Sequence, residues 1–139
     1  MNPPIVADSS GLVSLISESD SNHTFALKIA KELNSLNSLI IVPSDVFSET
    51  LNIIGKKLNH QLALEVGKEL ISSRAYSIIE TDGLLRNNAL TLFSKQAKSV
   101  SFTDCIVMVF ASNFKTRDIF GFDKAFKTNG YCRLGFDDN

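Results

Sequence analysis

Four acidic residues stand where apolar segments of the sequence meet a turn or a helix, and their side chains are the ones best suited to chemistry. They are Asp8, Glu49, Asp104 and Asp123. In an open α/β sheet the ligand crevice lies outside the carboxyl ends of the strands, so acids at these positions would point into one shared space. Carboxylates held that close repel one another, and a bound cation would relieve the repulsion.

Each acid also has a purely structural explanation. Asp8 could cap the helix that begins near Ser10, Asp104 could be a favourable charge near a positive helix end, and Asp123 could be a turn residue. Glu49 is different, because a glutamate at the margin of an apolar stripe is costly to bury without a partner. Four acids from separate segments at one sheet edge favour a joint site.

Ligands that are all carboxylates point to the hard cations Mg²⁺ or Mn²⁺ rather than to zinc. Such ions can orient a water, lower its pKa and neutralise the leaving oxygen when a phosphodiester is cleaved. Cys105 and Cys132 have no second Cys or His at metal-ligand spacing, so the sequence predicts neither a zinc site nor a disulfide framework. We therefore expect a cytoplasmic protein. His23 and His60 are expected at the surface.

Apolar strands alternate with amphipathic helices along the chain. The pattern predicts strands over 5–7, 39–42, 77–80, 119–122 and 131–134. It predicts helices over 10–16, 25–36, 43–58, 62–71, 85–93 and 103–113. Alternation of this kind gives a parallel sheet with helices on both faces. No repeat or linker interrupts it, so residues 1–139 are expected to form a single domain.

Composition excludes some classes of protein. The net charge of −1 argues against a generic nucleic-acid binder. If the four carboxylates hold a metal, however, the rest of the chain is net positive and offers lysines to phosphates. The longest apolar run, 105–111, is far shorter than the roughly 20 residues of a membrane span, and the start 1–4 lacks the basic residues of a signal peptide. Membrane insertion and secretion are not expected.

The segments that carry the acids resemble the PIN-domain family, in the same order along the chain. These segments are 5–10 (IVADSS), 43–49 (PSDVFSE), 101–105 (SFTDC) and 121–126 (GFDKAF). Single-domain members of this length are mostly VapC-type toxins of toxin-antitoxin pairs. The resemblance implies a three-layer α/β/α sandwich with a central parallel sheet, and a Mg²⁺- or Mn²⁺-dependent ribonuclease. Its partners would be RNA and an antitoxin that covers the acidic crevice.

By position, the resemblance implies that all four acids are catalytic and metal-binding. Asp8 and Asp104 would be the main ligands, Glu49 a ligand or positioner of the attacking water, and Asp123 an outer or second-metal ligand. Thr103 and Ser9 match hydroxyl positions that hold the carboxylates or the water. One departure is Gly121, because a Ser or Thr is common in the family two places before the last acid.

Other functions remain open from the sequence. An Asp-dependent phosphatase would need a second acid where Ser10 stands, and a receiver domain would need a lysine better placed than Lys124. A catalytically weak PIN-like module that binds RNA or protein would use the acids only as caps. A homodimer is expected through an apolar helix face. This face would comprise Leu51, Ile54, Leu58 and Leu62.

Overall fold

A five-stranded parallel sheet forms the centre of the computed structural model, which describes residues 3–137. The strands are β1 (Ile5–Ala7), β2 (Ile40–Pro43), β3 (Tyr76–Ile79), β4 (Asp118–Phe120) and β5 (Cys132–Arg133). Their order across the sheet is β3-β2-β1-β4-β5, and all neighbours are parallel. Residues 1, 2, 138 and 139 lie outside the described part of the chain. The expectation drawn from residues 1–4, that a signal peptide is lacking, therefore falls partly outside it. That residues 1–139 form one domain stays a prediction.

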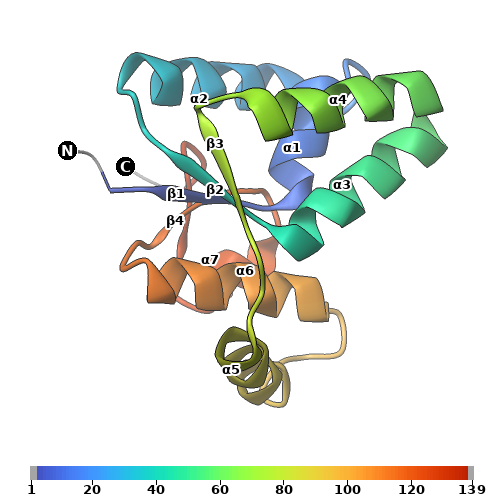
Figure 1. Cartoon of the computed structure of the whole chain (residues 1–139). Helices are drawn as coiled ribbons and strands as arrows, with labels where there is room; N and C mark the ends of the chain where they lie inside the picture. Colours follow the sequence, from blue (N-terminus) through green and yellow to red (C-terminus); the bar gives the residue numbers. More distant parts are fainter. Residues whose placement is uncertain (1–2, 138–139) are drawn as a thin grey trace.

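Helices cover both faces of the sheet, so the predicted three-layer α/β/α sandwich is confirmed (Figure 1). One layer contains α1 to α4 and the other contains α5 to α7. The helices are α1 (Ser9–Ile16), α2 (His23–Ser35), α3 (Ser44–Lys57), α4 (His60–Ser72), α5 (Gly83–Phe93), α6 (Phe102–Asn113) and α7 (Lys124–Thr128).

The core is formed by the central strands and by α6, which lies between the sheet and α5 (Figure 1). All three residues of β1 and all four of β2 are buried, as the continuous apolar runs of a two-sided parallel sheet require. Helix α6 is apolar nearly all round, and seven of its residues are buried. A helix of that composition has to be covered on several sides, which its position in the sandwich provides.

The chain reverses its direction across the sheet next to β1. It runs from β1 outward through β2 to β3, then returns through α5 and α6 to β4 on the other side of β1. Neighbouring connections at such a switch point leave in opposite directions and open a crevice at the carboxyl ends of the strands. The loops after β1 and β4 therefore border the same crevice.

The structure departs from the sequence pattern in a few places. The predicted strands are found within one to two residues of their expected bounds, but β5 has only two residues. The segment 124–130, which separates the last two predicted strands, begins with the short helix α7, which the sequence pattern did not predict. The predicted dimer face is wrong at Ile54, which is fully buried in the core of its own chain. Leu51 and Leu62 also pack against that core, and only Leu58 of the four is exposed.

Within residues 3–137, none of the helices combines the length and the apolar character needed to cross a membrane.

Candidate active site

Asp8 follows β1 directly and begins helix α1 as its N-cap residue. One carboxylate oxygen, Oδ2, accepts hydrogen bonds from the backbone N–H of Ser10 at 3.1 Å and from the Ser10 hydroxyl at 2.6 Å. The side chain is 3% exposed. The strand end and the cap together fix the carboxylate at the floor of the crevice.

Asp104 lies in the first turn of α6 and forms a capping box with Ser101. The backbone N–H of Ser101 donates to Asp104 Oδ2 at 3.1 Å, and the backbone N–H of Asp104 donates to the Ser101 hydroxyl at 3.1 Å. Such a reciprocal pair satisfies donors that a helix start leaves free. It also holds the buried carboxylate in a fixed direction.

Glu49 comes from α3 and is half-buried. The hydroxyl of Ser9, at the start of α1, donates to Glu49 Oε1 at 3.1 Å. Asp123 follows β4 and is the N-cap residue of α7, where its Oδ1 accepts from the backbone N–H of Ala125 at 2.9 Å. Asp123 is exposed. The acids thus come from four separate segments of the chain.

A single cleft of about 420 Å³ is lined by all four acids. The serines Ser9, Ser10 and Ser101 and the lysine Lys57, which ends α3, line the same cleft. The structure therefore brings together the predicted acids and Ser9. It holds the Ser9 hydroxyl against Glu49, and the role of Ser9 in the reaction stays a prediction.

Ser10 and Gly121 have roles that the sequence did not indicate. The Ser10 hydroxyl donates to Asp8 and accepts at 3.0 Å from the backbone N–H of Phe122, so it ties the first acid to the segment that leads to the last. A Cβ on Gly121 would lie 2.7 Å from the Asp8 Cβ and 3.2 Å from the Ser10 hydroxyl oxygen. The backbone at Gly121 therefore leaves no room for a side chain beside Asp8 and Ser10.

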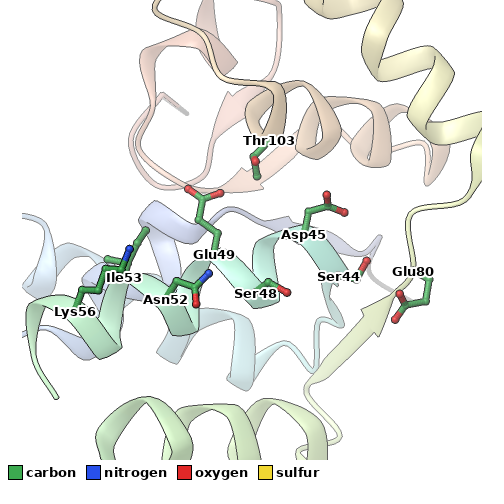
Figure 2. Close-up of a pocket in the computed structure, with 9 residues that line it drawn as sticks. All are labelled: Ser44, Asp45, Ser48, Glu49, Asn52, Ile53, Lys56, Glu80 and Thr103. Atoms are coloured by element: carbon green, nitrogen blue, oxygen red, sulfur yellow. The ribbon is translucent and has the colours of Figure 1, made fainter. Parts of the chain in front are cut away.

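A second, more open groove of about 660 Å³ adjoins the cleft along α3. Glu49 and Ile53 line both hollows. Figure 2 shows Glu49 and Asp45 pointing from α3 toward the helix that carries Thr103. Thr103 lies at this groove, and its hydroxyl makes no hydrogen bond to the four acids, all of which are among the described residues. Ser101, rather than Thr103, forms hydrogen bonds with Asp104. A contact of Thr103 with water or substrate stays a prediction.

A PIN domain model matches residues 5–130 of this chain. The chain belongs to the PIN-domain family. No curated protein matches its sequence significantly. Among solved structures, it is similar to Mycobacterium tuberculosis VapC20, described as a toxin that cleaves the sarcin-ricin loop. The TM-score is 0.81 at 17% sequence identity, and the likeness covers 94% of this chain and 98% of VapC20. At that identity the likeness concerns the fold.

The buried acids of this PIN domain hold a proton more readily than ordinary aspartates do. Burial, together with the charges of Asp104 and Glu49, raises the pKa of Asp8 from 3.8 to about 7 against the opposing effect of the Ser10 hydrogen bonds. Burial and repulsion from Asp123 and Glu49 raise the pKa of Asp104 to about 6, although its hydrogen bonds with Ser101 lower it. Both shifts express the cost of collecting negative charge where water is scarce.

The donor set of the cleft fits a hard divalent cation. Within residues 3–137 the ion pair found is Arg133 with Asp137, so no cationic side chain forms a salt bridge with the four acids. No ion pair therefore neutralises the four acids, although the charge of Arg133 acts on Asp123. Their ligand atoms are all oxygens, as Mg²⁺ and Mn²⁺ prefer. As the side chains stand, no group of three Asp, Glu, His or Cys in the described chain is close enough to hold a metal ion. Repulsion between carboxylates favours such a separated arrangement.

Proposed function

We propose that this PIN-domain protein is a Mg²⁺- or Mn²⁺-dependent endoribonuclease that hydrolyses RNA phosphodiester bonds. The observation that carries the proposal is the convergence of Asp8, Glu49, Asp104 and Asp123, from four segments, on one cleft at the switch point of the sheet. At the level of the family, PIN and VapC-type proteins are nucleases. The clustered acids and the family both support metal-assisted hydrolysis of phosphodiester bonds.

Each residue of the cleft has a task in this proposal. Asp8 and Asp104, the two buried acids, would hold the cation, and Asp123 at the exposed rim would complete its shell. When bound, a divalent cation lowers the pKa of a water and stabilises charge on a phosphate. Glu49, oriented by Ser9, accepts a proton from the attacking water or positions it. Lys57 offers its ammonium to a phosphate of the substrate.

The adjoining groove along α3 provides a path for the RNA on one side of the scissile bond. Its polar side chains include Ser48 and Asn52, and Lys56 lies at its edge. The acids Asp45 and Glu80 also line it, so the phosphates of an RNA would lie toward Lys56. Amides and hydroxyls can hydrogen-bond to base edges, while lysines contact phosphates without regard to sequence.

The test is cleavage of a mixed set of structured RNAs by the purified chain in Mg²⁺, Mn²⁺ or EDTA, beside the double variant Asp8→Asn, Asp104→Asn. We expect metal-dependent cleavage that the double variant loses. Melting supplies a second readout, because a cation that binds the folded state raises the melting temperature by mass action. Metal-dependent cleavage that persists in the double variant would refute the assignment of these acids.

We further propose that the protein is the toxin of a type II toxin-antitoxin pair and that an antitoxin covers the cleft. The similar fold of VapC20, itself described as a toxin, supports this. Expression of the chain in a host cell should then arrest growth, and expression of the double variant should not. Growth arrest by both the wild-type chain and the double variant would mean that toxicity does not depend on RNA cleavage at these acids. A homodimer remains part of the proposal, to be checked by light scattering.

A binding module is the second candidate, because Asp8 and Asp123 already serve as N-caps and Asp104 as the acid of a capping box. Asp8, Asp104 and Asp123 each use one carboxylate oxygen for this purpose. A module of this kind would bind RNA without cleaving it, and Mg²⁺ or Mn²⁺ would leave its melting temperature unchanged. Unchanged melting across millimolar metal, together with uncleaved RNA, would decide for this alternative.

A further inference from the structure

Three phenylalanine rings from distant parts of the chain meet beside the acidic cleft. Phe25 on α2, Phe122 before α7 and Phe136 near the C-terminus form what we call the phenylalanine platform. Ring centroids are 6.4 Å apart for Phe25 and Phe122, 5.5 Å for Phe25 and Phe136, and 5.8 Å for Phe122 and Phe136. The rings meet edge-on or tilted, so each supports the others as aromatic pairs prefer.

Arg133 fixes the platform to the cleft. Its guanidinium forms a two-pronged salt bridge with Asp137, with Nη2 to Oδ1 at 2.8 Å and Nε to Oδ2 at 2.9 Å. It also donates to the Phe122 carbonyl at 3.2 Å and lies 4.6 Å from the centroid of the Phe136 ring. The Arg133 and Asp137 side chains are only 11% and 9% exposed, so solvent screens the pair little.

The turn that presents Phe136 is packed tightly on α2. Gly135 has φ +74°, and a Cβ there would lie 2.8 Å from Ile29 Cγ1. Only glycine adopts this backbone without strain and leaves room for the helix. The position of Phe136 is therefore set by the folded chain before any ligand arrives.

The platform is exposed although it is apolar. Phe25 is 40% exposed and Phe136 is 46% exposed, while Phe122 is half-buried. Scattered exposed apolar residues need no explanation, but a fixed aromatic group does when it borders a functional cleft. Phe122 lines the same cleft as the four acids, together with Asn22 at the start of α2. The platform thus continues the wall of the cleft outward.

We propose that the phenylalanine platform stacks a nucleobase of single-stranded RNA next to the scissile phosphate. The inference rests on the proposed ribonuclease function and adds a binding site for one unpaired base. Proteins that bind single strands place bases on exposed aromatic side chains, and every base offers a face for this. A nucleotide whose phosphate lies among the acids would direct a neighbouring base toward Phe122 and the two outer rings.

The test uses two leucine variants, Phe25→Leu and Phe136→Leu, which keep apolar volume and remove the ring. Phe93→Leu is the matched control, because Phe93 is also 40% exposed and also makes an edge-on contact, with Phe102, outside the lining of the cleft. Each protein cleaves short single-stranded RNAs in which one nucleotide near the cut lacks its base. Melting temperatures show that the variants are folded.

For the wild type, we expect one abasic position to lower kcat/KM about tenfold, the value of a typical base-aromatic stack. On intact RNA, the kcat/KM of Phe136→Leu should be lower than that of the wild type by a similar factor. Removing the base should not lower the kcat/KM of this variant any further. The control should behave as the wild type. The wild type could instead cleave RNA while all variants show the same sensitivity to the abasic position as the wild type. That result would overturn base stacking on the platform and leave the proposed ribonuclease function intact.

Binding separates failure of this inference from failure of the proposed function. RNA carrying 2-aminopurine at the same position should show a fluorescence change on binding that Phe136→Leu reduces, even if the wild type cleaves nothing. An unchanged signal in Phe25→Leu and Phe136→Leu would overturn the inference. The inference would also be overturned if Phe25→Leu and Phe136→Leu cleaved and bound RNA normally but no longer self-associated in light scattering. That result would assign the platform to a contact between protein chains.

Discussion

Ser9 and Glu49, on different helices and 40 residues apart, are joined by a hydrogen bond from Ser9 Oγ to Glu49 Oε1 at 3.1 Å. Ser9 is 5% exposed, so its hydroxyl has little access to other partners. The bond couples the start of α1, where Asp8 is held, to the acid that α3 contributes. It therefore holds Asp8 and Glu49, which are proposed to act together, at a fixed separation.

Ser9→Ala should lower kcat by about tenfold with little change in KM, because a hydrogen bond to a charged group is worth about 1.5–3 kcal/mol and here it orients the acid rather than the substrate. Steady-state cleavage of a short RNA measures both constants. Ser72→Ala removes an exposed hydroxyl that donates to the Lys68 carbonyl on α4, and it serves as the control. A raised KM at unchanged kcat would instead mean that Ser9 contacts substrate.

Gly121→Ala should destabilise the fold and disturb the site together. The added Cβ would lie 2.7 Å from the Asp8 Cβ, closer than packed atoms come, and at a tight 3.1 Å from Phe126 Cε2. Overpacking of this kind costs about 1–3 kcal/mol, measured as the free energy of unfolding in urea. Because the strain falls on Asp8, RNA cleavage should decrease as well.

Gly83→Ala is the matched control for that variant. Gly83 begins α5, and no atom lies within 4 Å of a Cβ placed there. The substitution should leave stability unchanged or raise it by up to about 1 kcal/mol through the unfolded state. Equal stability of Gly121→Ala and Gly83→Ala would contradict the close approach of Gly121 to Asp8. Gly121→Ser should behave as Gly121→Ala, although the family commonly has a hydroxyl at this place.

Positions at strand ends were predictable from the sequence, and contacts between distant side chains were not. Runs such as 5–7 and 39–42 mark buried strands, and the parallel order of strands brings their carboxyl ends to one edge. The placement of Asp8 and Asp123 followed from that, whereas Glu49 and Asp104 lie on helices α3 and α6, and the packing of these helices brings the two acids to the same cleft. Which serine holds which carboxylate depends on where each helix begins, and Ser9 and Ser10 point to different acids although they are neighbours.

Two further features lay beyond the pattern of the sequence. Helix α7 has five residues, too few for an apolar period to be seen, and it forms because Asp123 caps it and Phe126 is buried. The phenylalanine platform joins residues 25, 122 and 136, whose meeting depends on the packing of the C-terminal turn on α2. Exposed apolar residues give no sign of such a cluster when they are read one at a time.

Thr50→Val should stabilise the protein. Among the described residues, the Thr50 hydroxyl oxygen is the buried side-chain polar atom that has no hydrogen-bond partner, and the residue is fully buried in α3. Valine has nearly the same shape and removes a hydroxyl that lost its water on folding. The free energy of unfolding should rise by about 1 kcal/mol.

Thr50→Ser is the control for the hydroxyl, since it keeps the unpaired oxygen and removes the methyl group. It should lower the free energy of unfolding, because a buried methyl is worth about 1 kcal/mol. RNA cleavage should be the same in both variants. A loss of stability in Thr50→Val would mean that the hydroxyl has a partner in solution.

The metal-free protein should lose stability as the pH rises from about 4 to about 7. Burial and neighbouring charges raise the pKa of Asp8 to about 7 and that of Asp104 to about 6 in the folded state, against 3.8 for an ordinary aspartate. Between these values the folded protein binds more protons than the unfolded chain does. Stability then falls with increasing pH. Urea unfolding in EDTA at a series of pH values measures the slope.

Asp8→Asn should flatten that slope and raise the stability of the metal-free protein above pH 7, because it removes a buried charge and can retain the cap on α1. The same variant should abolish RNA cleavage, so stability and activity oppose each other at this residue. Glu65→Gln on α4, an exposed position outside the cleft, should leave the slope unchanged. Millimolar Mn²⁺ should oppose the loss of stability at pH 7 in the wild type and not in Asp8→Asn. A wild-type stability that rises from pH 5 to pH 8 in EDTA would show that the acids are not crowded as the cleft places them.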